Sequence, residues 1–154
     1  MNHSDLAEKL FLEGYNCSQS VLAAFEDVTG ISRREALRLS SSFGGGMGRL
    51  REVCGAVTGA FMVLGLLYGY EDPKDRVAKT AHYARIQDFA GKFRELHGSI
   101  ICRELLKKPD TSPEPTPRTE QFYHARPCIA MVRDAAALVD RYMAENPLPT
   151  DLVP

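Results

Sequence analysis

The feature that most constrains this sequence is an uncharged stretch of 18 residues, Val53 to Tyr70, which reads VCGAVTGAFMVLGLLYGY. It just reaches the length of a membrane-spanning helix. Glycine and threonine weaken its apolar character, however, and no basic cluster follows it to set a topology. A helix that is apolar on every side can equally form the centre of a bundle. We therefore expect a buried core helix without membrane insertion, with Gly55 and Gly59 as its close-packing face.

The rest of the chain carries signals that start and stop helices. Asn16 with Gln19 and Ser32 with Glu35 have the spacing of capping boxes, in which each side chain pairs with the other residue's backbone N–H. Apolar residues at helical spacing continue into a last helix from about 127 to 145. No useful length of sequence alternates between apolar and polar residues. The sequence predicts an all-α fold: a compact bundle of six or seven helices around the central apolar helix.

At 154 residues, the chain is long enough to enclose one hydrophobic core, so we expect a single domain over 1–154. Five prolines fall within the segment 107–127. This composition predicts an extended loop, long enough to act as a lid or a binding loop. Pro147 and Pro149 follow the last helix and predict a tail at 147–154.

Composition excludes several classes of function. Lys and Arg number 19 and Asp and Glu number 20, which gives a formal net charge of −1 and no overall field to attract nucleic acid. Trp is absent, so no stacking platform for bases is evident. No secretory signal opens the sequence, and we therefore expect a cytoplasmic location, where thiols are kept reduced.

The four cysteines each stand beside a predicted helix start: Cys17, Cys54, Cys102 and Cys128. In a first turn, unpaired N–H groups and the helix dipole favour an anion and can lower a thiol pKa from about 8.5 to roughly 3.5–7.5. Thiolates attack disulfides and bind soft metals. Cysteine is also a common inert core residue. Because no C-x-x-C is present, any site must be assembled from separate helices.

A glycine-rich segment lies just before Cys54. It reads GGGMG and is followed by Arg49 and Arg51, a combination that can cradle an anion and let a ligand approach the sulfur. It lacks the Lys-Ser/Thr of a phosphate-binding loop, so a tight connector between helices is the alternative interpretation. The candidate cofactor-binding residues are Gly44, Gly45, Gly46, Gly48 and Arg49.

The segment 54–59 reads CGAVTG, a C-G-A-x-x-G motif. With the other three cysteines and their flanks, it makes the chain resemble the C_GCAxxG_C_C family of redox-active proteins from about residue 8 to residue 145. The resemblance implies a small helical protein whose thiols are redox-active or bind a metal. Because related modules occur with electron-transfer cytochromes, it also implies an iron–sulfur cluster as a candidate cofactor.

Three functions are therefore open. The first is a thiol oxidoreductase in which Cys54 attacks, one of Cys17, Cys102 and Cys128 resolves the disulfide, and an unidentified redox partner exchanges electrons. The second is a metal or iron–sulfur protein that uses three or four of the same cysteines as ligands. The third is a non-catalytic helical interaction module, with a homodimer as the default assembly. The first two functions require the sulfurs to lie in one anion-friendly site.

Overall fold

A computed structural model describes residues 1–107 and 110–149 of the chain. Within those ranges regular structure is helical, apart from one isolated antiparallel bridge between Val53 and Ile101, so the predicted all-α fold is confirmed. The elements in chain order are α1 (His3–Leu12), α2 (Cys17–Ala24), α3 (Glu26–Thr29), α4 (Arg33–Ser40), the 3₁₀ turn η1 (Ser41–Phe43), α5 (Gly44–Met47), α6 (Gly55–Tyr68), α7 (Arg76–His97), α8 (Cys102–Leu106), α9 (Glu120–Ala125) and α10 (Cys128–Glu145).

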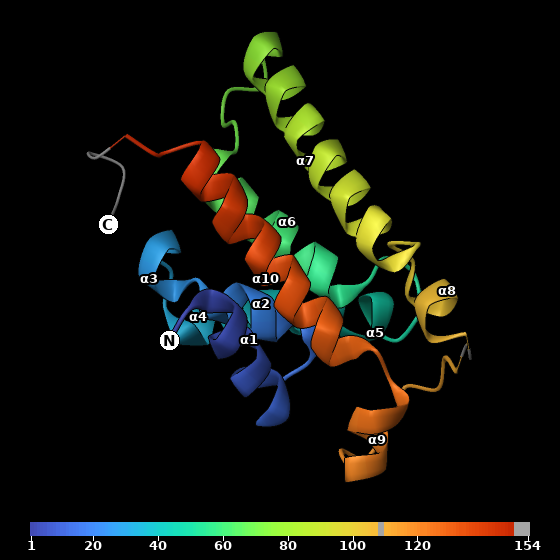
Figure 1. Cartoon of the computed structure of the whole chain (residues 1–154). Helices are drawn as coiled ribbons and strands as arrows, with labels where there is room; N and C mark the ends of the chain where they lie inside the picture. Colours follow the sequence, from blue (N-terminus) through green and yellow to red (C-terminus); the bar gives the residue numbers. More distant parts are fainter. Residues whose placement is uncertain (108–109, 150–154) are drawn as a thin grey trace.

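The apolar helix α6 lies in the core, as predicted. Helices α2 and α10 pack against it, and α1 packs on both α2 and α10 (Figure 1). A side chain at Gly59 would place its Cβ 2.8 Å from the Ser18 carbonyl oxygen, so α2 and α6 approach each other too closely for any residue but glycine. In the part of the chain that the structure describes, no helix is long and apolar enough to cross a membrane.

The helix boundaries follow the predicted capping signals with three differences. Both capping boxes, at Asn16 and at Ser32, are formed. The helix that begins after Asn16 breaks at the buried Phe25, which has a non-helical φ of −103° and ψ of 20°, so that α3 is separate. Asp72 and Pro73 have the residue types of a helix start, which predicts a helix from there, but α7 begins at Arg76 because the Asp75 side chain caps it by accepting from the Ala78 N–H. The Pro-rich segment contains the additional short helix α9. The described residues therefore contain more helices than the predicted six or seven.

Helix α7 reaches the bundle only with its C-terminal half, where Phe89 and Phe93 are buried, and its N-terminal half projects away from it (Figure 1). Arg85 holds the middle of this helix. Its Nε donates a hydrogen bond to the Tyr142 hydroxyl at 2.6 Å, and its guanidinium lies 5.0 Å from the centre of the Tyr68 ring. The N-terminal half of α7 therefore does not cover the end of the bundle at which α8 and α9 lie (Figure 1).

The predicted loop at 107–127 crosses the end of the molecule where α8 and α9 lie (Figure 1). Residues 110–119 have no regular structure, and Thr119 caps α9 by accepting a hydrogen bond from the Phe122 N–H at 3.1 Å. Residues 108–109 of this loop lie outside the described residues. Of the predicted tail, 147–149 have no regular structure, and 150–154 again lie outside the described part.

Candidate redox site

The four cysteines stand at helix starts, as predicted. Cys17, Cys102 and Cys128 are the first residues of α2, α8 and α10, and Cys54 is the residue before α6. All four line one cavity of about 490 Å³. The fold therefore gathers thiols that are far apart in the sequence around a common space.

Main-chain hydrogen bonds fix the backbone positions of two of these cysteines, Cys54 and Cys102. The Cys54 N–H donates to the Ile100 carbonyl at 2.8 Å, and the Cys102 N–H donates to the Glu52 carbonyl at 2.6 Å. Between these two bonds lies the antiparallel bridge of Val53 and Ile101. The backbone segments before α6 and before α8 are thus paired, and this pairing fixes the positions of Cys54 and Cys102 in the wall of the same cavity.

The glycine-rich segment forms a left-handed turn in the wall of the cavity. Positive φ values run without interruption from Gly45 (66°) to Arg49 (64°) and recur at Arg51 (62°). A Cβ on Gly46 would lie 2.6 Å from the Cys102 Cβ and 2.7 Å from the Arg51 Cα, so only glycine permits this contact. The predicted binding residues all line the cavity: Gly44, Gly45, Gly46, Gly48 and Arg49.

The glycine that follows Cys54 has a similar role on the opposite side. A Cβ on Gly55 would lie 3.0 Å from the Cys17 Cβ and 3.1 Å from the Ser18 N. Contacts of this length are tighter than ordinary van der Waals packing, so a side chain here would push α2 away. The glycine of the C-G pair thus lets the Cys17 end of α2 approach the start of α6.

Burial outweighs the helix N-terminus at two of the thiols. Burial raises the pKa of Cys54 to about 12, and the N–H groups of Ala56 and Val57 only partly oppose it. Burial also raises the pKa of Cys102, against the attraction of the Arg51 guanidinium, whose Nη1 lies 3.7 Å from the sulfur. Both thiols therefore hold their protons more tightly than a free cysteine.

The remaining two thiols, Cys17 and Cys128, line the same cavity and influence each other. The neighbouring Cys128 side chain, burial and the charge of Cys128 together raise the pKa of Cys17 well above its usual value. The Cys17 side chain lowers the pKa of Cys128, and the positive charge of Arg126 adds to this effect against the opposing effect of burial. Cys128 is therefore the first of the four thiols to ionise. The expected lowering of the pKa at all four helix starts is therefore wrong for three of the thiols, and at Cys128 the lowering comes from Cys17 and Arg126 and not from the helix start.

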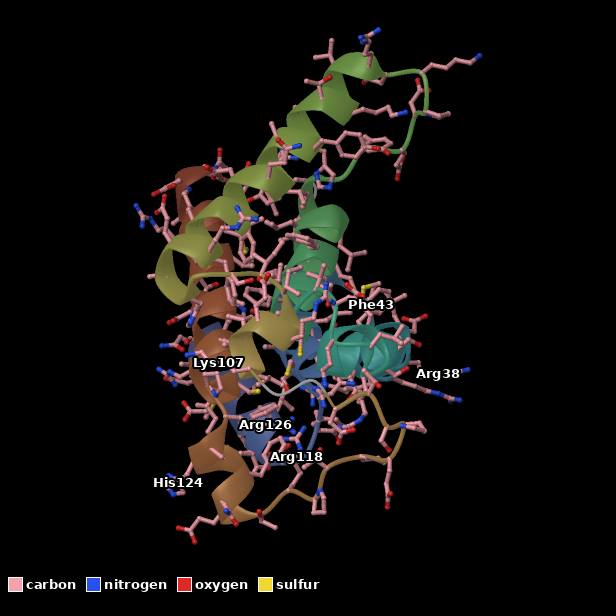
Figure 2. The ribbon with its side chains drawn as sticks, turned by 90° about the vertical axis from the view of Figure 1, so that its right-hand side faces the viewer. Arg38, Phe43, Lys107, Arg118, His124 and Arg126 are labelled. Carbon is pink, nitrogen blue, oxygen red and sulfur yellow. The ribbon has the colours of Figure 1, made fainter. Side chains whose placement is uncertain are left out.

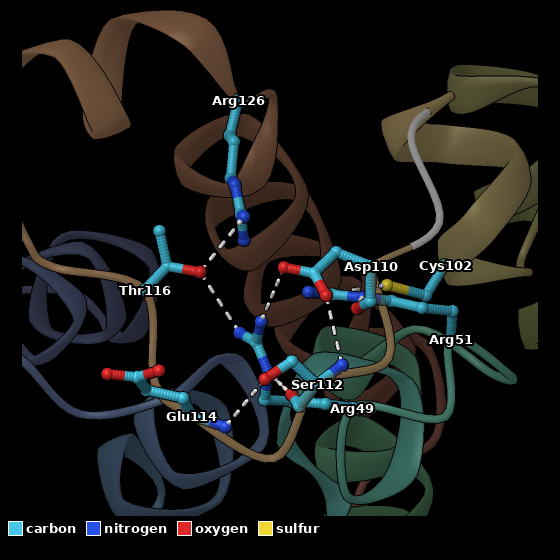
Figure 3. A network of polar contacts seen from close by, with 8 residues as sticks. All are labelled: Arg49, Arg51, Cys102, Asp110, Ser112, Glu114, Thr116 and Arg126. Atoms are coloured by element: carbon cyan, nitrogen blue, oxygen red, sulfur yellow. Dashed lines mark hydrogen bonds and ion pairs between the residues drawn. The ribbon is translucent and has the colours of Figure 1, made fainter.

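Arginines supply the charge of the cavity. Its lining contains four of them and, among the described residues, no Asp or Glu. Arg49 and Arg126 meet at Thr116, whose hydroxyl oxygen accepts from them at 3.0 and 3.3 Å (Figure 3). Arg51 is only 2% exposed, and its Nε donates to the Asp110 carbonyl at 2.8 Å (Figure 3). The cavity is thus strongly electropositive.

Two of these arginines were not singled out in the sequence. Arg118 lies just before α9 and Arg126 lies just after it, next to Pro127. The two side chains line the cavity and lie near one another at one end of the molecule (Figure 2). Arg118 donates to the carbonyls of Phe11 and Tyr15 at 3.0 and 2.9 Å. The only available signal was the position of Arg126 two residues before Cys128.

The side chains do not fit a metal ion as they are arranged. In residues 1–107 and 110–149, no group of three or more His, Cys, Asp and Glu side chains has the arrangement of a metal site. The metal-ligand set expected from the sequence shares one cavity but not one coordination centre: Cys17, Cys54, Cys102 and Cys128. A shared ion or cluster would require these sulfurs to move.

The fold and the cavity together describe a small helical protein with a site made of four thiols and four arginines. Comparison of the sequence with known families then identifies its family. The family model C_GCAxxG_C_C, described as "Putative redox-active protein", matches residues 15–142, a range that includes all four cysteines. The chain belongs to this family, as the resemblance predicted. No curated protein and no solved structure gives a significant match.

Proposed function

We propose that this protein carries out thiol–disulfide exchange, with Cys128 as the attacking thiolate and Cys17 as the resolving thiol. The observation that carries the proposal is that the Cys17 and Cys128 thiols line one cavity, where the Cys17 side chain lowers the pKa of Cys128 and so favours its thiolate. The sequence pointed instead to Cys54 as the nucleophile. A pKa of about 12 leaves Cys54 protonated at neutral pH, so it is poorly suited to attack.

The reaction proceeds in two exchanges. The Cys128 thiolate attacks one sulfur of a substrate disulfide, which forms a mixed disulfide, breaks the substrate S–S bond and releases one half as a thiolate. Cys17 gives its proton to that thiolate and attacks the Cys128 sulfur. The Cys17–Cys128 disulfide forms, and the second half leaves as a thiolate that takes a proton from water. The two cysteines lose two electrons and the substrate gains them.

The surroundings of the pair suit this chemistry. Arg126 favours the thiolate form of Cys128, and Arg118 acts on Cys17 in the same direction. As Cys17 is partly exposed and lines the cavity, a small substrate has a route to the pair. We further propose a cytoplasmic location, where small thiols return such a disulfide to its reduced form.

Peptide mapping tests the assignment of the pair. Reduced protein is treated with hydroxyethyl disulfide, remaining thiols are blocked, and the disulfide is located by mass spectrometry. We expect one bond, between Cys17 and Cys128, and the same bond in a Cys54→Ala variant. A bond between Cys54 and Cys102, or a stable mixed disulfide with no internal bond, would contradict the proposal.

The pH dependence of alkylation tests the roles within the pair. We expect Cys128 to react with iodoacetamide at a lower pH than the other three thiols, because the neighbouring Cys17 side chain lowers its pKa. Cys17→Ala removes this polar neighbour and should shift the midpoint for Cys128 upward, whereas Cys17→Ser keeps a polar hydrogen there and should shift it less. An unchanged midpoint in Cys17→Ala would show that Cys17 does not activate Cys128.

Two alternatives from the sequence are separated by other measurements. The metal or iron–sulfur hypothesis predicts bound metal, with sulfide for a cluster, after anaerobic purification, and metal-free protein with four titratable thiols would exclude it. The interaction-module hypothesis, with a homodimer as its simplest form, predicts that replacement of all four cysteines by serine leaves association unchanged. Loss of association in that variant would contradict it.

A further inference from the structure

The charges of the cavity are unbalanced, and this imbalance bears on the substrate. Arg49 pairs with the carboxylate of Asp110 at 3.3 Å. Among the described residues, the other three cavity arginines form no ion pair with an Asp or Glu side chain: Arg51, Arg118 and Arg126. Three guanidinium charges are therefore held around the thiols without acidic partners.

Arg51 makes the strongest case. It is 2% exposed, its Nε donates to the Asp110 backbone carbonyl and its Nη1 lies 3.7 Å from the Cys102 sulfur. Its Nη2 has no hydrogen-bond partner among the described residues. A buried guanidinium is stable only when its donors are satisfied and its charge is compensated. Because this side chain lines the cavity, a bound anion would supply both.

The partners of the other two arginines are also neutral. Arg118 donates to two backbone carbonyls, and Arg126 donates to the Thr116 hydroxyl. These contacts fix the positions of the guanidinium groups without neutralising them. The Cys128 thiolate supplies one negative charge to the cavity, which leaves a positive surplus when the other thiols are protonated.

We infer that the small molecule that exchanges with Cys128 is an anionic disulfide that carries carboxylate groups, bound through Arg51 and Arg126. The inference rests on the proposed exchange function and names the class of its substrate. The cavity, at about 490 Å³, is of the size that binds small molecules in proteins. Carboxylate oxygens match the forked donors of a guanidinium.

The test compares three small disulfides that differ in charge: anionic dithiodipropionate, neutral hydroxyethyl disulfide and cationic cystamine. Formation of the Cys17–Cys128 disulfide is followed for each, and every rate is divided by the rate of the same disulfide with dithiothreitol, an uncharged dithiol that reduces all three. We expect dithiodipropionate to exceed cystamine by about tenfold or more at low ionic strength, with a smaller ratio in high salt.

Variants separate substrate binding from activation of the thiolate. Arg126→Gln should reduce the ratio of the dithiodipropionate rate to the hydroxyethyl disulfide rate several-fold, and Arg51→Gln should do the same if it folds. The matched control is Arg38→Gln, because Arg38 is exposed on α4 and does not line the cavity (Figure 2). It should leave the ratio unchanged. Equal loss with both disulfides in Arg126→Gln would mean that the arginine serves only the thiolate, and would overturn the inference.

The two proposals fail in different ways. Equal normalised rates for all three disulfides would overturn the anionic substrate but keep the exchange function. If none of the three disulfides oxidises the pair, the exchange function fails, and calorimetric titration with adipate then decides the anion site. Adipate binding that is weakened in Arg126→Gln would support the site, and absence of adipate binding by the wild-type protein would overturn it.

Discussion

Replacement of Gly46 by alanine tests whether the left-handed turn is required to hold the site together. Gly46 has a φ of 71°, and its added Cβ would lie 2.6 Å from the Cys102 Cβ, 2.7 Å from the Arg51 Cα and 2.8 Å from the Glu52 N. Two of these three atoms belong to the backbone. They can move only if the paired segments before α6 and α8 move as well.

Gly48 in the same turn provides a matched control. It has a φ of 61°, but the nearest atom to its added Cβ is the Ser42 carbonyl oxygen at 3.8 Å, an ordinary contact. Both substitutions incur about 1–2 kcal/mol for a left-handed residue with a side chain. Only Gly46→Ala adds overpacking, which typically costs about 1–3 kcal/mol. We therefore expect Gly46→Ala to lower the free energy of unfolding by about 2–5 kcal/mol and Gly48→Ala by about 1–2 kcal/mol.

Urea unfolding under reducing conditions, followed by far-ultraviolet circular dichroism, measures both values. The difference between the two variants isolates the steric contribution, because the backbone strain is common to both. If Gly46→Ala and Gly48→Ala destabilise the protein equally, the close approach of Gly46 to Cys102 is not a real constraint. In that case, the glycine turn does not position Cys102.

Two further predictions concern α6 and the pH dependence of stability. Leu64 is fully buried, so Leu64→Ala should lower the free energy of unfolding by about 2–5 kcal/mol in urea titrations. Leu66→Ala, at a 45% exposed position of the same helix, should lower it by less than about 1 kcal/mol. Equal losses in the two variants would contradict a core position for α6. Because the pKa of Cys54 is raised from 9.0 to about 12, its contribution to stability is complete below pH 9 and is lost as the pH rises towards 12. Above pH 9, the free energy of unfolding should fall more steeply in the wild type than in Cys54→Ala, by roughly one kcal/mol per pH unit, and parallel curves would show that Cys54 ionises normally.

The local features of the fold were predictable because their causes are local. The capping boxes at Asn16 and Ser32 satisfy backbone groups within one helical turn, so their residue types and spacing suffice to place them. The same holds for the position of the four cysteines at helix starts. The central place of the apolar helix followed from its lack of charge, since such a segment has no favourable position on the surface.

The properties of the site depended on tertiary contacts that the sequence does not display. The sequence placed Cys54 in an anion-friendly first turn, but its pKa depends more on burial, which is set by segments distant in the chain. The positive φ values of Arg49 and Arg51 fall on residue types that rarely adopt them, so no sequence signal indicated that the left-handed turn extends beyond the glycines. Likewise, nothing local in the Pro-rich segment indicates that Arg118 turns back to the end of α1.

The pairing of the segments before α6 and α8 uses only main-chain atoms, so it does not depend on the side chains of Glu52 and Ile101, whereas Val53 and Ile100 also pack against the core. Evolution can exchange the first two residues while the spacing of the neighbouring sulfurs is preserved. Related chains should therefore diverge more at Glu52 and Ile101 than at Val53 and Ile100. Insertions or deletions there should be rare, because one additional residue would shift one sulfur out of step with the other.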